Sequence, residues 1–166
     1  MEPLSAGDYK GVSPLLPATG YIRTTMLIEK LDRDRHNLED IKRLLALAIT
    51  YPTRERLEQL MEEFYAEEGR TIFVAVKDGK AIGIIGMVHG NRARGVIAHL
   101  AVHPDTRRQG IGRRLIDNAV AALGLKDIEA ETDQDAVGFY RACGFETREI
   151  ESQYPGVQRF RCVYNK

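Results

Sequence analysis

The stretch from Gly95 to Ile116 constrains this chain more than any other, because it reads as a strand, a tight loop and a helix in immediate succession. Residues 96–102 form an apolar run of strand length. Both faces of the run are mostly apolar, so a central strand buried on both sides is predicted. Pro104 ends the strand because it has no amide proton to give to a sheet. Apolar residues then recur at helical spacing, and a helix is predicted to start at or near Gly110.

The loop between this strand and this helix has the chemistry of an anion site. The first backbone N–H groups of a helix lack partners inside it, and the helix dipole places partial positive charge there. Gly110 and Gly112 carry no side chain that would keep a ligand away from those groups. Fixed positive charge surrounds them at Arg107, Arg108, Arg113 and Arg114. We therefore expect a phosphate or pyrophosphate to bind there, and a solvated basic helix start is the alternative interpretation.

Two motifs in this part of the chain resemble one known family. Arg107-x-x-Gly110-x-Gly112 resembles the acyl-CoA signature Gln/Arg-x-x-Gly-x-Gly/Ala of the GNAT N-acetyltransferase superfamily. Downstream, Phe139–Phe145 resembles that family's next segment, a helix that bears a tyrosine and is followed by a Gly-Phe turn. The two motifs together, in the right order, are more specific than either alone. The resemblance covers roughly residues 70–164.

The resemblance implies a set of residues that bind acetyl-CoA. The backbone of the central strand is implied to meet the pantetheine arm and the thioester carbonyl at Leu100, Ala101 and Val102. The pyrophosphate segment is implied to comprise Arg107, Arg108, Gln109, Gly110, Ile111, Gly112 and Arg113. Asp133 stands where the family often has Asn, and an Asp accepts hydrogen bonds but cannot donate them as an amide does.

Tyr140 matches the family tyrosine that lies against the cofactor and protonates the leaving thiolate. The alternative interpretation is a tyrosine that packs its helix against the sheet, with a hydroxyl that merely holds the sulfur. The reaction implied is direct attack of a neutral amine on acetyl-CoA, and a lysine-type amine with a pKa of about 10.4 must lose a proton first.

The sequence leaves the general base open. Family members that carry a base on the central strand have it at the positions of Val96 and Ala98, which are both apolar here. Strict alternation along a strand points His99 to the opposite face, where a histidine is commonly a satisfied core residue. The candidates are therefore a water chain, Glu131, His89 and His99.

Composition limits the partners and the compartment. Lys plus Arg equals Asp plus Glu at 24 each, so the formal net charge is zero, which favours neither nucleic acid nor membrane as a partner. No apolar stretch approaches the ~20 residues of a membrane span, and no signal-peptide pattern occurs. Cys143 and Cys162 are too few for a disulfide framework, and Cys143 has no visible paired base. A cytoplasmic protein with free thiols and no metal site is predicted.

The pattern of the whole chain of 166 residues predicts one α/β (α+β) domain with a single mixed sheet and helices on both faces. Residues 1–24 are expected to be an irregular lead, and residues 25–166 the GNAT N-acetyltransferase domain. Strands are predicted at 26–31, 71–76, 81–88, 96–102, 126–132, 145–151 and 157–164. Helices are predicted at 38–49 after an Asn37 cap, from Thr53 to Gly69, and at 110–123 and 136–142. The strands up to 96–102 are expected to be antiparallel, and 126–132 parallel to 96–102 because a helix joins them.

Three functions are compatible with these observations. The first is an N-acetyltransferase that moves an acetyl group from acetyl-CoA to a primary amine of a small molecule or peptide. The second is a non-catalytic acyl-CoA-binding or sensing module. The third, a toxin-type enzyme directed at nucleic acid, is disfavoured by the zero net charge. Strand 157–164 is also expected to leave an edge through which a homodimer could form.

Overall fold

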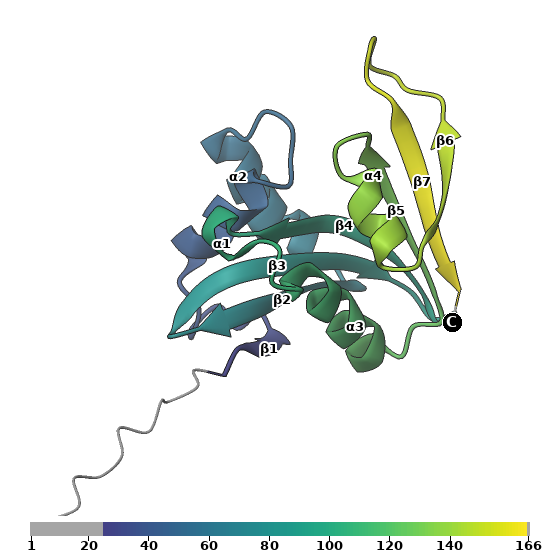
Figure 1. Cartoon of the computed structure of the whole chain (residues 1–166). Coiled ribbons are helices and arrows are strands. Elements are labelled where there is room, and N and C mark those ends of the chain that lie inside the picture. The colour runs from purple at the N-terminus through teal and green to yellow at the C-terminus, as the bar shows by residue number, and fades with distance from the viewer. Residues whose placement is uncertain (1–24, 166) are drawn as a thin grey trace, which may run out of the picture.

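The computed structural model describes residues 25–165, so the expectations for residues 1–24 lie outside the described residues. The strands form one seven-stranded sheet in the order β1-β2-β3-β4-β5-β7-β6 (Figure 1). Their bounds are β1 (Leu27–Lys30), β2 (Arg70–Lys77), β3 (Lys80–His89), β4 (Arg94–Val102), β5 (Asp127–Asp133), β6 (Glu146–Ile150) and β7 (Arg159–Asn165).

Helices cover both faces of this sheet, which confirms the predicted fold class. On one face, α1 (Leu38–Ala46) and α2 (Arg54–Glu62) pack over β2, β3 and β4. On the other face, α3 (Ile111–Leu123) and α4 (Val137–Ala142) enclose the larger core. Two short 3-10 helices, η1 (Phe64–Ala66) and η2 (Pro104–Thr106), follow α2 and β4.

The pairing of the central strands creates a gap in the sheet. The strands from β1 to β4 pair antiparallel, and β4 pairs parallel with β5, both as predicted. The parallel pairing runs only from Arg94 opposite Asp127 to Ile97 opposite Ala130. Beyond those residues the two strands diverge (Figure 1). The last part of β4 is therefore paired on its β3 side alone.

A β-bulge in β4 overturns the expected direction of one side chain. Gly86 of β3 lies opposite His99, whereas the next residue, Met87, lies opposite Ile97, so Ala98 is an extra residue without a partner. The bulge restarts the alternation, so His99 faces the same side as Val96, on the α1–α2 face. The prediction that His99 faces away from Val96 is therefore wrong.

The expected burial of β4 on both faces is also only partly met. Val96 is 45% exposed because it lies on the face that no helix covers at that end of the strand. The α1–α2 pair reaches the later part of β4 and stops short of its beginning.

The second helix is shorter than predicted. It begins after Thr53, whose side chain caps it, but it ends at Glu62 and not at Gly69. The chain then turns through η1, which carries Phe64 and Tyr65 toward the sheet, where Tyr65 contacts His99. This tertiary contact replaces the last turns that the helical spacing suggested. The first helix likewise ends at Ala46.

The last strand is internal, so the expectation that 157–164 leaves an edge is wrong. β7 lies between β5 and β6 and pairs antiparallel with both. The reason is burial: Cys162 is fully buried opposite Ala130, whereas β6 has no buried residue and suits the edge. The free edges of the described sheet are β1 and β6.

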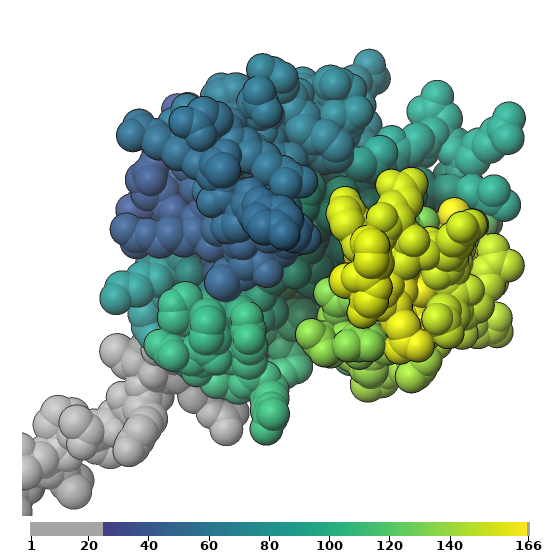
Figure 2. Space-filling view, turned by 90° about the horizontal axis from the view of Figure 1, so that it is seen from above, coloured from purple at the N-terminus to yellow at the C-terminus, as the bar shows by residue number. Residues whose placement is uncertain are grey.

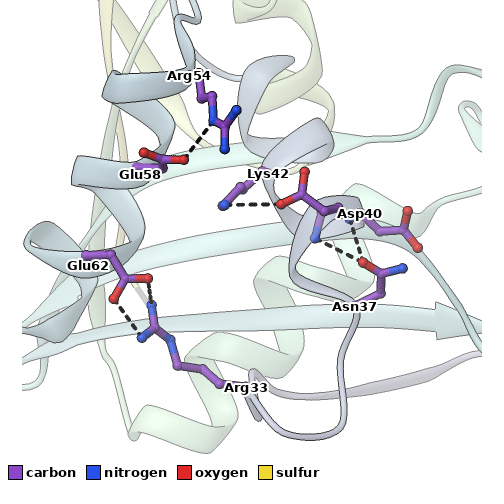
Figure 3. Close-up of polar contacts among 8 residues, drawn as sticks. Arg33, Asn37, Asp40, Lys42, Arg54, Glu58 and Glu62 are labelled. Atoms are coloured by element: carbon purple, nitrogen blue, oxygen red, sulfur yellow. Dashed lines mark hydrogen bonds and ion pairs between the residues drawn. The ribbon is translucent and has the colours of Figure 1, made fainter.

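Polar contacts secure the α1–α2 pair and fix where α1 begins (Figure 3). Arg33 donates to both carboxylate oxygens of Glu62 at 3.1 and 2.8 Å and to the carbonyl of Met61 at 2.9 Å. Asn37 caps α1, because its side-chain oxygen accepts from the backbone N–H groups of Glu39 at 3.0 Å and Asp40 at 3.4 Å. The predicted Asn37 cap is confirmed.

Replacing Asn37 by Ala should lower the free energy of unfolding by about 0.5–2 kcal/mol, because two N–H groups of the first turn lose their acceptor. Denaturant titration measures the change. Asn118→Ala is the matched control, since Asn118 lies in the middle of α3 and caps nothing. That variant should be neutral or slightly stabilised because alanine favours helix. Equal losses in the two variants would contradict the capping role.

Candidate active site

The gap between β4 and β5 opens onto a hollow at one end of the sheet. The space-filling view shows this hollow between the α1–α2 part and the β6–β7 part of the molecule (Figure 2). The loop that follows β4 leads from the gap to the start of α3. The backbone of β4, the start of α3 and the α4 segment therefore lie around the gap between β4 and β5.

The loop after β4 has the open geometry that an anion site requires. Gly110 is the N-cap of α3 with a φ of +75°, a conformation that favours glycine, and a Cβ there would meet nothing within 4 Å. Arg108 also has a positive φ of +60°, and residues 107–110 are all exposed. The first N–H groups of α3 have no side-chain cap, so they are available to a ligand.

Gly112 has a packing role beside the predicted one. A Cβ at this position would lie 2.9 Å from the ring of Phe139 on α4, so the missing side chain makes room for that ring. Gly112 is buried, whereas Gly110 is exposed. The two predicted motifs thus pack directly against each other, and the missing side chain of Gly112 lets α3 pack closely against α4.

Two of the predicted arginines are already engaged. Arg107 donates through Nε to the carbonyl of Val102 at 3.1 Å, which ties the loop to the end of β4. Arg113 donates to the carbonyl of Ala142 at 3.3 Å and so connects α3 to the end of α4. Within residues 25–165, Arg108, Gln109 and Arg114 make no hydrogen bond or ion pair through their side chains.

The backbone of β4 offers free groups toward the gap at two of the three predicted residues. His103 donates its N–H to the carbonyl of Ile82 on β3. Because antiparallel residues alternate in direction, Ala101 also points its backbone groups at β3, whereas Leu100 and Val102 point theirs toward β5. The Val102 carbonyl takes the Arg107 contact, which leaves the N–H groups of Leu100 and Val102 and the Leu100 carbonyl.

Tyr140 lies on α4 in the larger core cluster and is only 6% exposed. Its ring makes edge contacts with Phe139 and Phe145, with centroids 5.2 and 5.3 Å away. Its hydroxyl makes no hydrogen bond to any residue of the described chain and is not fully buried. Burial raises the pKa of Tyr140, and the neighbouring Cys162 and Cys143 raise it further. The phenol therefore stays protonated and free to donate.

Asp133 positions α4 from the end of β5. Its carboxylate accepts the backbone N–H groups of Asp135 at 3.0 Å and Ala136 at 3.1 Å, which shapes the turn into the helix that carries Tyr140. Burial raises the pKa values of the Cys143 and Cys162 thiols, so neither is an activated nucleophile. Both thiols are free, as predicted.

The structure separates the three side chains that were candidates for the general base. His89 is the last residue of β3 and lies opposite Gly95, at the start of β4. Its Nε2 is hydrogen-bonded to the Thr71 hydroxyl at 3.1 Å. Glu131 is exposed on β5 and forms ion pairs of 4.0 and 3.7 Å with Arg159 and Arg161. Of the three, His99 alone lies on the part of β4 that is not paired with β5.

Sequence reasoning missed Tyr65 and Gly86, which both contact the His99 region. The Tyr65 hydroxyl lies 2.5 Å from His99 Nδ1, and it occupies the space where a side chain on Gly86 would begin. The one available signal was the glycine itself, since an isolated glycine inside a strand often marks a close approach.

A cavity of about 240 Å³ adjoins this site along α3, from Arg113 to Val120. It is lined by Arg113, Ile116, Asp117, Val120, Ile128, Cys143, Phe145 and Tyr164. Between residues 25 and 165, no helix is both long and apolar enough to cross a membrane.

Comparison with known proteins identifies the family. Residues 68–147 match the model of the acetyltransferase (GNAT) domain. The chain is 34% identical over 93 residues to an uncharacterized N-acetyltransferase in the lysA 3' region of Bacillus methanolicus, which covers 54% of this chain and 72% of that protein. It is 35% identical over 110 residues to the peptidyl-lysine N-acetyltransferase YjaB of Salmonella typhimurium, covering 61% of this chain and 71% of that protein.

The fold agrees with that assignment. A crystal structure of an aminoglycoside 6'-N-acetyltransferase complexed with coenzyme A superposes with a TM-score of 0.69 at 18% identity, over 84% of this chain and 96% of that one. Because residues 68–147 match this family model and two N-acetyltransferase relatives are matched over most of their length, this chain belongs to the GNAT family of acetyl-CoA-dependent N-acetyltransferases.

Proposed function

We propose that this protein acetylates a primary amine by direct attack on acetyl-CoA bound in the gap between β4 and β5. The observation that carries the proposal is the divergence of these strands beyond Ile97 and Ala130, directly before an open helix start. The gap offers unpaired backbone groups, and the loop offers N–H groups and arginines suited to a pyrophosphate.

The proposed roles of the strand residues follow from their directions. The N–H and C=O groups of Leu100 and the N–H of Val102 are free to pair with the pantetheine arm as an added strand would. An N–H aimed at the thioester carbonyl stabilises the oxyanion that forms on attack. One well-placed donor of this kind is worth about 2.7–4 kcal/mol of barrier.

Tyr140 is proposed to donate its phenolic proton toward the sulfur as the C–S bond breaks. The hydroxyl has no hydrogen-bond partner among residues 25–165, and the raised pKa keeps it protonated over the whole working range of pH. A thiolate whose thiol has a pKa of about 8.5 is thereby hydrogen-bonded as it leaves. Proton return to the phenolate comes from the amine, which must shed a proton after it has attacked.

The acceptor is proposed to be the primary amine of a small molecule or peptide. A peptide-borne lysine is one such amine, and the Salmonella relative is named for that reaction. The amine must approach from the α1–α2 face, because α3 and α4 fill the other face of the gap with core residues. We also propose a cytoplasmic location.

Gly110→Glu should weaken acetyl-CoA binding at least tenfold, because it puts a carboxylate where the pyrophosphate meets the helix start. Calorimetry with acetyl-CoA measures the affinity. Gly124→Glu is the matched control: Gly124 caps the other end of α3, has a φ of +62° and also has open space around it. It adds the same charge and the same backbone strain, and should leave the affinity unchanged. Unchanged affinity in Gly110→Glu would refute the site.

Tyr140→Phe should lower kcat by roughly 10²–10⁴, the range of a positioned general acid, while acetyl-CoA binding survives. The assay should run above pH 8 with an accepted amine, so that the supply of neutral amine does not mask the acid step. Tyr164→Phe is the control, since Tyr164 packs against Phe145 in the same cluster away from the gap. Equal kcat values for Tyr140→Phe and the unaltered protein would remove Tyr140 from the mechanism.

A homodimer is also proposed through β6, one of the two free edges of the described sheet, since β7 is internal. Light scattering at tens of micromolar protein should give twice the mass of one chain. The mass of a single chain at that concentration would reject the dimer.

A further inference from the structure

The roles proposed so far do not involve the hydrogen-bonded pair of Tyr65 on η1 and His99 on β4. His99 belongs to the part of β4 that is not paired with β5. The Tyr65 hydroxyl and His99 Nδ1 are 2.5 Å apart, joining η1 to β4 across 34 residues of chain. The bulge at Ala98 turns His99 to the face from which the acceptor must approach. This pair therefore stands beside the path of the amine.

The surroundings hold this pair in one arrangement. The Tyr65 hydroxyl sits over Gly86, where any side chain would displace it. Phe64 makes edge contacts with both rings, with centroids 4.9 Å from Tyr65 and 5.9 Å from His99. The guanidinium of Arg70 lies over the Phe64 ring at 4.0 Å. Both rings are thus fixed by packing.

In the hydrogen bond between Tyr65 and His99, the tyrosine hydroxyl is the donor. Within the described residues, His99 Nδ1 is the one hydrogen-bond partner of the Tyr65 hydroxyl. A phenol withdrawn from water needs an acceptor for its proton, so Tyr65 donates to Nδ1. A neutral imidazole that accepts at Nδ1 carries its proton at Nε2. That second nitrogen makes no hydrogen bond within the described residues and is not fully buried, so it remains accessible to solvent.

The charges around the pair favour an uncharged imidazole. Burial lowers the pKa of His99, and Arg56 on α2 lowers it further. Burial raises the pKa of Tyr65, while Arg70 on β2 acts in the opposite direction. The other neighbouring elements bring no charge to the pair. α1 contributes the apolar residues Ile41, Leu44 and Leu45, β3 contributes Gly86, and α3 lies on the opposite face of the sheet. On β5, Glu131 shares the face of His99 but is paired with arginines.

We propose that His99 is a neutral hydrogen-bond donor that orients the acceptor through Nε2–H, that Tyr65 positions it by holding this tautomer, and that His99 is not the general base. The inference rests on the proposed function. It assigns the acceptor a chemical class: a primary amine that also carries a hydrogen-bond-accepting oxygen, a carbonyl or a hydroxyl. It leaves to water the proton that the free ammonium loses before attack, because a nitrogen that already bears a proton cannot take another.

The first test needs no acceptor. In a ¹⁵N NMR titration, the His99 ring should show the Nε2–H tautomer. Donation from Tyr65 stabilises the neutral ring, so Tyr65→Phe should raise the pKa of His99. If Tyr65 instead accepted from Nδ1–H, it would stabilise the imidazolium, and the same substitution would lower the pKa. A lowered pKa, or an Nδ1–H tautomer in the unaltered protein, overturns the proposal. Tyr51→Phe, on an exposed ring, is the control and should change neither.

The second test separates a donor from a base by kinetics. The amide of Gln can donate as Nε2–H does but cannot take up a proton, so His99→Gln should keep kcat and KM within about threefold. His99→Leu should raise KM roughly two- to tenfold with kcat retained, the effect of one lost neutral hydrogen bond. Calorimetry with acetyl-CoA verifies that both variants are folded. A large loss of kcat in both variants would show His99 to be the base.

Matched amines test the acceptor class. A lysine-containing peptide amide carries the oxygen, and n-pentylamine lacks it. The KM penalty of His99→Leu should appear with the first and vanish with the second; an equal penalty with both amines contradicts the proposed contact. If the unaltered protein releases no CoA with any amine, the proposed function fails, whereas the NMR titration still decides the state of His99.

Discussion

Parallel pairing between β4 and β5 that stops after four residue pairs is the constraint on which the rest of this site depends. A fully paired sheet would bury the backbone groups of Leu100 and Val102 in a ladder and leave no entry for an extended ligand. The separation costs the sheet several hydrogen bonds. Flanking contacts hold the divergent halves in place, and Arg107 and Arg113 tie the loop and α3 to the ends of β4 and α4.

The bulge at Ala98 divides β4 into two segments with different neighbours. Before it, Ile97 faces the α3 core and pairs with β5; after it, Leu100 faces that core again while the backbone is released from β5. The same extra residue turns His99 toward η1. A single insertion in the alternation thus sets the direction of the backbone edge that faces the gap and the direction of the His99 side chain.

Local signals in the sequence were sufficient for much of the fold and for the anion loop. Asn37 before an amphipathic run, Pro104 after an apolar strand and Gly110 at a helix start each act within a few residues, so their effects could be predicted. The bulge could not, because residues 96–102 are apolar throughout and give no signal of where alternation breaks. Tyr65 and His99 are far apart in the chain, and helical spacing alone extended α2 through the residues that form η1. The position of β7 depended on which strand buried more side chain, a competition that hairpin spacing does not reveal.

The internal position of β7 has a consequence for how the chain reaches this structure. Until Arg159–Asn165 pairs, β5 has no partner beyond Ala130 on either side, and Ile128, Ala130 and Thr132 lack the strand that completes their core. The sheet can then close only after nearly all of the described chain is present. An intermediate that contains β5 and α4 without β7 would expose a long unpaired edge, the kind of surface through which partly folded chains aggregate. Assembly of the half of the sheet that contains β5 and β7 is thus a late, non-local event in folding, even though β5 and α4 precede β7 by many residues.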